Sequence, residues 1–324
     1  METHTAQASA HPNIAFIKYW GNRNDALRIP ANDSLSMTLG GLTTTTNVTF
    51  DAELASDEFL LDGKEPGAAA RERVAAHLDL MRLETGETRF ARVESMNSFP
   101  AGAGIASSAS AFAALTIAAA SAADVQFDPR TLSRLARRGS GSAARSILGG
   151  YVQLHAADED EFSYAESIAP REHWRLIDLI AVVDRTHKQT GSTRGHQTAS
   201  SSPLQTARVA DAGRRLEACR TAITARDFAH LAHVAEQDSN MMHAVMLTSS
   251  PPLLYWAPAS LSVMRRVNEL RQDGLDVFYS VDAGPNVHCL CTPDAAREVL
   301  SALGQVPGVA EILHAETGAP PTCT

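Results

Sequence analysis

The sequence is poor in cysteine and contains no long apolar run. Four of its 324 residues are cysteines, and no two of them form a Cys-x-x-Cys pair. This spacing excludes the usual zinc sites and a disulfide framework, so we expect reduced cysteines in a cytoplasmic protein. No stretch is long and apolar enough to span a bilayer, and METHTAQASAHPN at the start lacks the apolar core of a signal peptide.

An excess of positive charge is also missing. The chain has 28 Lys and Arg against 37 Asp and Glu, giving a net charge of −9. This balance argues against nucleic-acid and anionic-membrane partners, so an anionic substrate would need a local cluster of basic residues. The length suggests two domains, and the polar stretch that begins at Asp184 marks the boundary, giving residues 1–185 and 186–324.

Predicted strands and helices alternate irregularly, which indicates an α+β fold. Residues 1–10 are small and polar and predict a loose tail, and the stretch from 184 to 202 predicts a loop. Apolar spacing predicts strands at 13–20, 34–50, 88–96, 276–280 and 287–291, and helices at 65–83, 128–138, 203–225, 227–246 and 260–272.

The stretch FPAGAGIASSASAFAAL, residues 99–115, combines two glycines, two adjacent serines and an alanine-rich segment. Gly102 and Gly104 let a ligand approach the main chain. A helix that starts near Ser107 or Ser108 would direct unpaired N–H groups at that ligand, which suits a nucleotide phosphate. A glycine-serine turn that only caps a buried helix explains the same residues equally well.

Four stretches in this order carry a family resemblance: HPNIAFIKYWGNRND, FPAGAGIASSASAFAAL, RRGSGSAARSILGGY and SVDAGPNVH. Together they resemble the mevalonate diphosphate decarboxylases, relatives of galactokinase, homoserine kinase and mevalonate kinase (the GHMP superfamily). The resemblance implies a two-domain GHMP-kinase-like fold, with an ATP-binding N-terminal domain like domain 2 of ribosomal protein S5. It also implies a ferredoxin-like C-terminal domain, an active-site cleft between the two, ATP and Mg²⁺ as cofactors, and a homodimer.

The family reaction phosphorylates the tertiary 3-hydroxyl of a 5-phosphorylated mevalonate and then releases phosphate and CO₂. The resemblance implies that Asp282 is the catalytic carboxylate and that Lys18 keeps it ionised and helps to orient the hydroxyl. Arg145 would grip the substrate carboxylate. Taken without the resemblance, these residues also fit an aspartate that caps its own turn, a lysine on an edge strand and a surface arginine.

The resemblance also assigns binding residues. The candidates for the substrate are Asn13, Tyr19, Asn22, Ser140, Ser142, Ser192 and Arg194. The candidates for ATP are Gly102, Ala103, Gly104, Ile105, Ala106, Ser107 and Ser108, with the hydroxyl of Ser107 or Ser108 toward Mg²⁺. The spacing of His187, His196 and His243 is not that of a metal site, so we expect these histidines to be hydrogen-bonded or exposed.

One departure from the family bears on the substrate. Many members that use the diphosphate read Trp-Gly-Lys, whereas this chain reads Trp20-Gly21-Asn22. Loss of a cation affects a diphosphate more than a monophosphate, whose charge is about −1.5 to −2. We therefore predict the phosphomevalonate decarboxylase branch, which converts mevalonate 5-phosphate into isopentenyl phosphate, ADP, phosphate and CO₂. Mevalonate 5-diphosphate is the alternative, since Arg23 could restore the charge, and a small-molecule kinase without decarboxylation is a second alternative.

Overall fold

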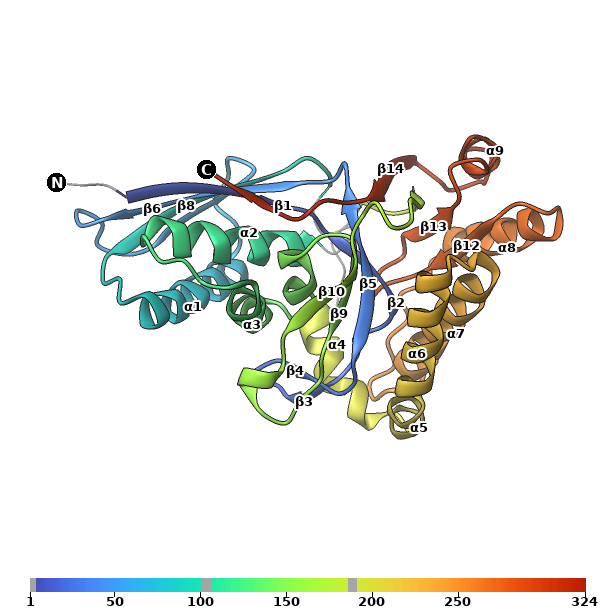
Figure 1. The fold of residues 1–324 in the computed structure, drawn as a ribbon, viewed down its shortest axis with the longest axis horizontal. Helices are drawn as coiled ribbons and strands as arrows, with labels where there is room; N and C mark the ends of the chain where they lie inside the picture. The colour runs from blue at the N-terminus through green and yellow to red at the C-terminus, as the bar shows by residue number, and fades with distance from the viewer. Residues whose placement is uncertain (1–3, 101–106, 186–190) are drawn as a thin grey trace.

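Two mainly antiparallel sheets, each covered by helices, frame the protein (Figure 1). The structure is a computed structural model, and it describes residues 4–100, 107–185 and 191–324. The first sheet has the order β15–β1–β6–β8–β7, and only its β7–β8 pair is parallel. Its strands are β1 (His4–Ala10), β6 (Thr44–Asp51), β7 (Glu58–Leu61), β8 (Phe90–Asn97) and β15 (Thr322–Cys323).

The prediction of a loose tail over residues 1–10 is wrong for the part that the structure describes. β1 pairs with β6 along its whole length, from His4 opposite Phe50 to Ala10 opposite Thr44. Its alternate alanines lie buried in the core beneath the sheet. Alanine is a weak strand former, so the strand depends on pairing and burial that a local pattern does not reveal.

Three helices cover the first sheet: α1 (Ala68–Thr85), α2 (Ser107–Ala122) and α3 (Pro129–Gly139). The α2 helix is rich in alanine and packs against β1, β6 and the 3₁₀ helix η1 (Gly141–Ile147). Small side chains on several faces allow this close packing. Asp128 caps α3 by accepting a hydrogen bond from the Thr131 N–H at 2.7 Å, and Pro129 occupies the first helical turn.

The second sheet joins strands from the two ends of the chain. Its order is β10–β9–β5–β14–β11–β13–β12, and β2 also pairs with β5. The strands are β2 (Asn13–Ile17), β5 (Ser34–Gly40), β9 (Tyr151–Leu154), β10 (Ala165–Ala169), β11 (Ile177–Val182), β12 (Val277–Ser280), β13 (Val287–Cys291) and β14 (Glu311–Thr317). A separate short hairpin pairs β3 (Asn22–Asn24) with β4 (Ile29–Pro30).

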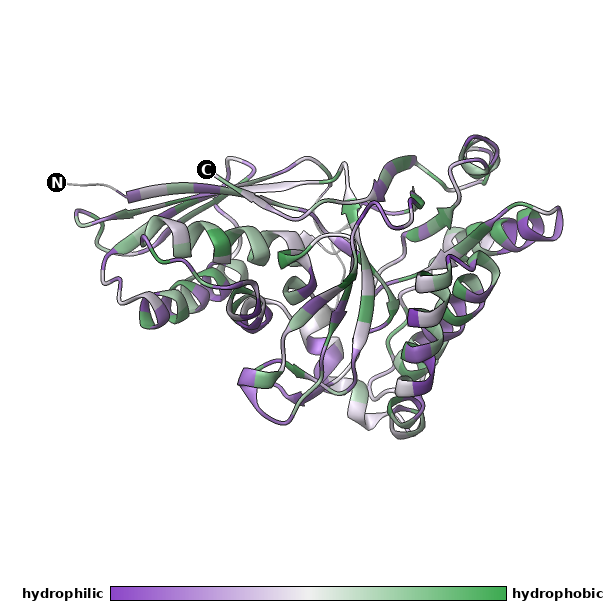
Figure 2. Cartoon of the chain, viewed as in Figure 1, coloured by the Kyte–Doolittle hydropathy of each residue, from purple (hydrophilic) through white to green (hydrophobic). Residues whose placement is uncertain are grey.

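Helices from the second half of the chain pack on both faces of this sheet. Side chains of α6 (Ala212–Ala225) and α7 (Phe228–Thr248) share one core with β2, β5 and β11. Side chains of α8 (Pro258–Gln272) and α9 (Ala296–Leu303) share another core with the opposite face of β11 to β13. Figure 2 shows hydrophobic residues along the central strands and many hydrophilic residues at the loops and on the outward turns of helices.

The stretch from 184 to 202 is not simply a loop. Its described part forms α4 (Ser192–Thr198) and the 3₁₀ helix η3 (Ala199–Ser201). The remaining elements are η2 (Asp160–Phe162) and α5 (Gln205–Ala210). The α+β architecture is confirmed, although β11, which precedes the predicted boundary at 185, pairs with β13 and β14 from the second half. None of the helices in the described ranges is long and apolar enough to cross a membrane.

Candidate active site

The sheet brings a lysine from the start of the chain against an aspartate from near its end. Lys18 follows β2, and Asp282 lies in the turn between β12 and β13. Lys18 Nζ donates a hydrogen bond to Asp282 Oδ1 at 2.6 Å. The Lys18 side chain is 1% exposed and that of Asp282 is 26% exposed, so solvent reaches the pair from the side of the aspartate. Lys18 is therefore not a solvent-exposed lysine on an edge strand.

The charges around Asp282 favour its ionised form. Burial by itself raises the pKa of this carboxyl group. The charge of Lys18, followed by those of His288 and Arg145, lowers the pKa by more, so the net pKa lies below the ordinary value of 3.8. Asp282 is consequently a carboxylate at neutral pH, able to accept a hydrogen bond or a proton from a bound hydroxyl.

The backbone of Lys18 is held by buried charged side chains that the sequence analysis missed. Asp238 Oδ2 on α7 accepts the Lys18 N–H at 2.6 Å, and Arg208 Nη2 on α5 donates to the Lys18 carbonyl at 2.8 Å. Arg215 binds the other oxygen of Asp238 at 2.7 Å. All three side chains are fully buried. The signal that could have identified Asp238, Arg208 and Arg215 is a charged residue at a helix position that packing buries.

Arg145 lies on η1 and is buried among neutral partners. It donates to Ser34 Oγ at 2.6 Å and to Ser36 Oγ at 2.9 Å on β5. Burial lowers the pKa of Arg145 to about 10, against the opposing effect of Asp282, so the guanidinium stays charged at neutral pH. No carboxylate forms an ion pair with it within the described part of the chain. This arrangement leaves positive charge near Asp282 that an anionic ligand could neutralise.

Asn13 connects Arg145 to other residues of η1. Its Oδ1 accepts a hydrogen bond from Arg145 Nη2 at 3.2 Å. Its Nδ2 donates to the Ser142 carbonyl at 3.1 Å and to Ser146 Oγ at 2.8 Å. Asn13 is almost completely buried, so it positions Arg145 and the 140–146 segment. Ser140 Oγ lies 3.2 Å from Ser108 Oγ, which ties this segment to the first turn of α2.

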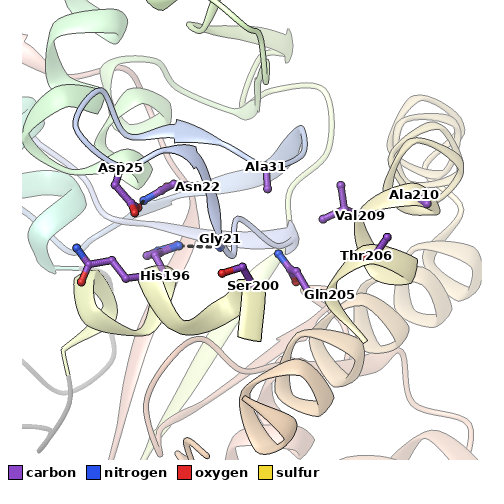
Figure 3. Close-up of a pocket in the computed structure, with 11 residues that line it drawn as sticks. Gly21, Asn22, Asp25, Ala31, His196, Ser200, Gln205, Thr206, Val209 and Ala210 are labelled. Atoms are coloured by element: carbon purple, nitrogen blue, oxygen red, sulfur yellow. Dashed lines mark hydrogen bonds between the residues drawn. The ribbon is translucent and has the colours of Figure 1, made fainter. Parts of the chain in front are cut away.

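Tyr19, which follows Lys18 in the chain, packs against His196 of α4. Their rings stack with centroids 4.2 Å apart, and the Tyr19 hydroxyl donates to Asn22 Oδ1. His196 Nδ1 accepts the Gly21 N–H at 3.0 Å, as Figure 3 shows. Burial, reinforced by nearby arginines, lowers the pKa of His196 to about 3, so the ring is neutral. The prediction that His196 is a hydrogen-bonded histidine is confirmed.

The other predicted histidines and α4 residues differ in their surroundings. His243 Nε2 lies 3.2 Å from the Val281 carbonyl and is hydrogen-bonded as expected, whereas His187 lies outside the described residues. Ser192 is the first residue of α4 and Arg194 is exposed on the same helix, so both belong to a helix rather than to the predicted loop. No group of three or more metal-binding side chains occurs within the described ranges.

The structure describes only part of the predicted nucleotide-binding segment. Gly102, Ala103, Gly104, Ile105 and Ala106 lie outside the described residues. α2 begins at Ser107, in agreement with the predicted start of the helix. Its first N–H groups have no partner within the helix, as at the start of any α-helix.

A separate cavity of about 450 Å³ opens beside His196 (Figure 3). Residues from the β3–β4 hairpin, α4, η3 and α5 line it, including Asn22, His196 and Gln205. Asp25 is the one charged residue of this lining, and its carboxylate accepts a hydrogen bond from Asn22 Nδ2 at 2.7 Å. Lys18, Arg145 and Asp282 are not part of the lining. This cavity is therefore not suited to a phosphate group.

Comparisons with known proteins agree along almost the whole chain. Residues 10–165 match the family described as diphosphomevalonate decarboxylase-like N-terminal domain, and residues 178–321 match the mevalonate 5-diphosphate decarboxylase C-terminal domain. The diphosphomevalonate decarboxylase of Candida albicans is 36% identical over 97% of this chain and 92% of its own length. That of Aspergillus fumigatus is 40% identical over 87% of this chain and 75% of its own length.

Solved structures support the same relationship. Mevalonate diphosphate decarboxylase from Staphylococcus aureus superposes with a TM-score of 0.95 at 34% identity, covering 100% of this chain and 98% of that one. The enzyme from Enterococcus faecalis gives a TM-score of 0.92 at 34% identity, covering 100% of this chain and 99% of that one. These matches confirm the resemblance drawn from the four sequence stretches. The chain belongs to the mevalonate diphosphate decarboxylase family of the GHMP superfamily.

Proposed function

We propose that this chain catalyses the ATP-dependent decarboxylation of a 5-phosphorylated mevalonate. The observation that carries the proposal is the ion pair between Lys18 Nζ and Asp282 Oδ1 at 2.6 Å, with the charged Arg145 close enough to lower the pKa of Asp282. The relatives bear the name diphosphomevalonate decarboxylase, and one solved structure holds the substrate abbreviated MVAPP together with AMPPCP and magnesium.

Each of the three charged residues has a role that its surroundings support. Asp282, ionised at neutral pH, accepts the hydrogen bond of the 3-hydroxyl and then its proton. Lys18 holds the carboxylate in one orientation and keeps it ionised. Arg145 has a rigid, buried guanidinium that suits the substrate carboxylate and fixes it for loss as CO₂.

The start of α2 fits a nucleotide. Its first N–H groups and the hydroxyls of Ser107 and Ser108 form the donor set that phosphate oxygens and Mg²⁺ would meet. Ser108 also contacts Ser140, so this end of the helix lies against a segment with candidate substrate residues. ATP would supply the phosphoryl group, and Mg²⁺ would neutralise its charge.

Mevalonate 5-diphosphate is the substrate that the relatives support, with isopentenyl diphosphate as the product. This was the alternative in the sequence analysis, and the names of the relatives favour it over mevalonate 5-phosphate.

The monophosphate stays a second candidate because of the residues near Asn22. Asn22 is neutral and bonds to Tyr19 and Asp25. Arg23, which could have restored the missing charge, instead pairs with Asp158 at the surface. The hairpin strand β3 thus offers no free cation of its own.

Side-by-side kinetics test these candidates. The purified protein, with ATP and Mg²⁺, is assayed on mevalonate 5-diphosphate and on mevalonate 5-phosphate for kcat/KM. CO₂ and ADP are measured in the same reactions, and equal amounts support decarboxylation, whereas ADP without CO₂ identifies a kinase. A higher kcat/KM for the monophosphate would replace the first candidate by the second.

Three broader features are also proposed. Division into a nucleotide-binding region, 1–185, and a second region, 186–324, is supported by two successive family matches, over residues 10–165 and 178–321. A homodimer follows from the resemblance and is tested by sedimentation. A cytoplasmic location is consistent with four cysteines that are all free, three of them buried.

A further inference from the structure

Three arginines gather beside the segment that carries Ser140. Arg28 lies just before β4, Arg73 lies on α1, and Arg138 lies in the last turn of α3. Arg28 Nε donates to the Arg138 carbonyl at 3.0 Å, and Arg73 Nη2 donates to the Gly139 carbonyl at 3.2 Å. Two separate elements therefore direct guanidinium groups at consecutive carbonyls immediately before Ser140.

The charges of this arginine cluster are poorly neutralised. Neighbouring Arg134 and Arg137 both bind Asp160 closely, whereas Arg138 only reaches the same carboxylate at 3.5 Å. Across the described ranges, no carboxylate lies within ion-pair distance of Arg28 or Arg73. Arg73 Nε is buried without a hydrogen-bond partner. In a chain of net charge −9, such a group of cations indicates a site for an anion.

The Tyr19–His196 stack lies against the segment that carries Ser140, because a Cβ added at Gly141 would lie 2.2 Å from the Tyr19 ring, and Arg28 is near enough to act on both rings. Burial raises the pKa of Tyr19, and Arg28 exerts the strongest opposing effect of the nearby charges. Burial lowers the pKa of His196 to about 3, and Arg28 is again the charge that contributes most. Both rings are therefore neutral at pH 7, so neither neutralises the guanidinium.

We infer that Arg28, supported by Arg73 and Arg138, binds the terminal phosphate of a 5-diphosphate substrate. The inference rests on the proposed function. A diphosphate end carries more negative charge than a monophosphate, and a guanidinium can donate two parallel hydrogen bonds to phosphate oxygens. Arg28 thus provides the cation that Asn22 does not, from the same hairpin but from the turn just before its second strand. The phosphates of ATP have the same chemistry and are the other possible source of the anion.

Steady-state kinetics of Arg28→Gln distinguish these sources. We expect KM for mevalonate 5-diphosphate to rise about tenfold to a hundredfold, the range for losing one hydrogen bond to a charged group. KM for mevalonate 5-phosphate and for ATP, and kcat at saturation, should stay near their original values. Arg28→Lys keeps the charge and should recover part of the loss. Arg23→Gln is the matched control, because Arg23 lies in the same hairpin but pairs with Asp158 at the surface.

A larger effect on KM for ATP, or an equal effect on the two mevalonate phosphates, would overturn the assignment. A direct titration separates it from the proposed function. Inorganic pyrophosphate is titrated calorimetrically into the protein while a non-hydrolysable ATP analogue saturates the nucleotide site. Binding that Arg28→Gln weakens at least tenfold supports the subsite even if the chain decarboxylates neither substrate. Equal binding by both proteins refutes the subsite even if decarboxylation is observed.

Discussion

Replacement of Asp282 by asparagine is the most direct test of the proposed chemistry. The substitution keeps the shape of the side chain and removes its charge, which leaves Lys18 buried, 1% exposed, without its carboxylate. Breaking a buried pair costs about 3–5 kcal/mol. Because Asp282 is 26% exposed and an asparagine oxygen still accepts a hydrogen bond, we expect a smaller loss in the free energy of unfolding, about 2 kcal/mol.

The effect on catalysis should be much larger than this loss of stability. Asparagine cannot accept the proton of the 3-hydroxyl, so kcat should fall by about 10²–10⁴. In the proposed site ATP binds at the start of α2 rather than at Asp282, so the Kd for ATP should stay close to its original value. The assay is CO₂ and ADP release at saturating substrate, with the fold checked by urea unfolding. Asp273→Asn, an exposed position at the end of α8, is the control. A kcat near that of the unsubstituted protein would show that Asp282 is not the base.

Three further predictions concern the same site. Asp238→Ala should lower the free energy of unfolding by about 3–5 kcal/mol, measured by urea unfolding, because it leaves the buried Arg208 without its carboxylate and Arg215 with Asp211 alone. Because the folded pKa of Asp282 lies below 3.8, its contribution to stability should persist from neutral pH down to about 4 and be lost only as pH falls through the folded pKa. The pH profile of kcat/KM should therefore show no acidic limb from this group above about pH 4. A limb centred near pH 6 that Asp282→Asn abolishes would contradict this prediction. Asn22→Lys should raise the ratio of kcat/KM for the diphosphate over the monophosphate about tenfold, the gain from one hydrogen bond to a charged group, and an unchanged ratio would place the terminal phosphate elsewhere.

Local patterns predicted much of the fold. The alternation of TTTNVTFD matches β6, whose buried and partly exposed residues alternate along the strand. The apolar spacing of 227–246 predicted α7, and Asp128-Pro129 predicted the start of α3. Patterns failed where the neighbours decide the structure. The polar residues 192–198 form α4, although the sequence there has few large apolar residues.

The candidate site divides in the same way. Lys18, Asp282 and Arg145 were predicted from motifs, and the structure brings the first two into contact. Asp238 and Arg208 were missed because an aspartate or arginine on a helix normally faces solvent. The role of Arg28 was missed because only the folded chain places it beside the Arg138 carbonyl.

By itself, the sequence determined the family and the α+β class, and its motifs singled out Lys18, Arg145 and Asp282 as candidate catalytic residues. It did so because strand and helix periodicity and short motifs are local properties of a chain. The family resemblance, not a local pattern, implied that Lys18 meets Asp282 across 264 residues of sequence, and the structure shows that contact. The tertiary structure alone decided that the Lys18 backbone is held between Asp238 and Arg208. It also decided that Arg28 rather than Arg23 turns toward the interior. Those outcomes depend on which strands pair and which charges become buried together, and no local pattern encodes them.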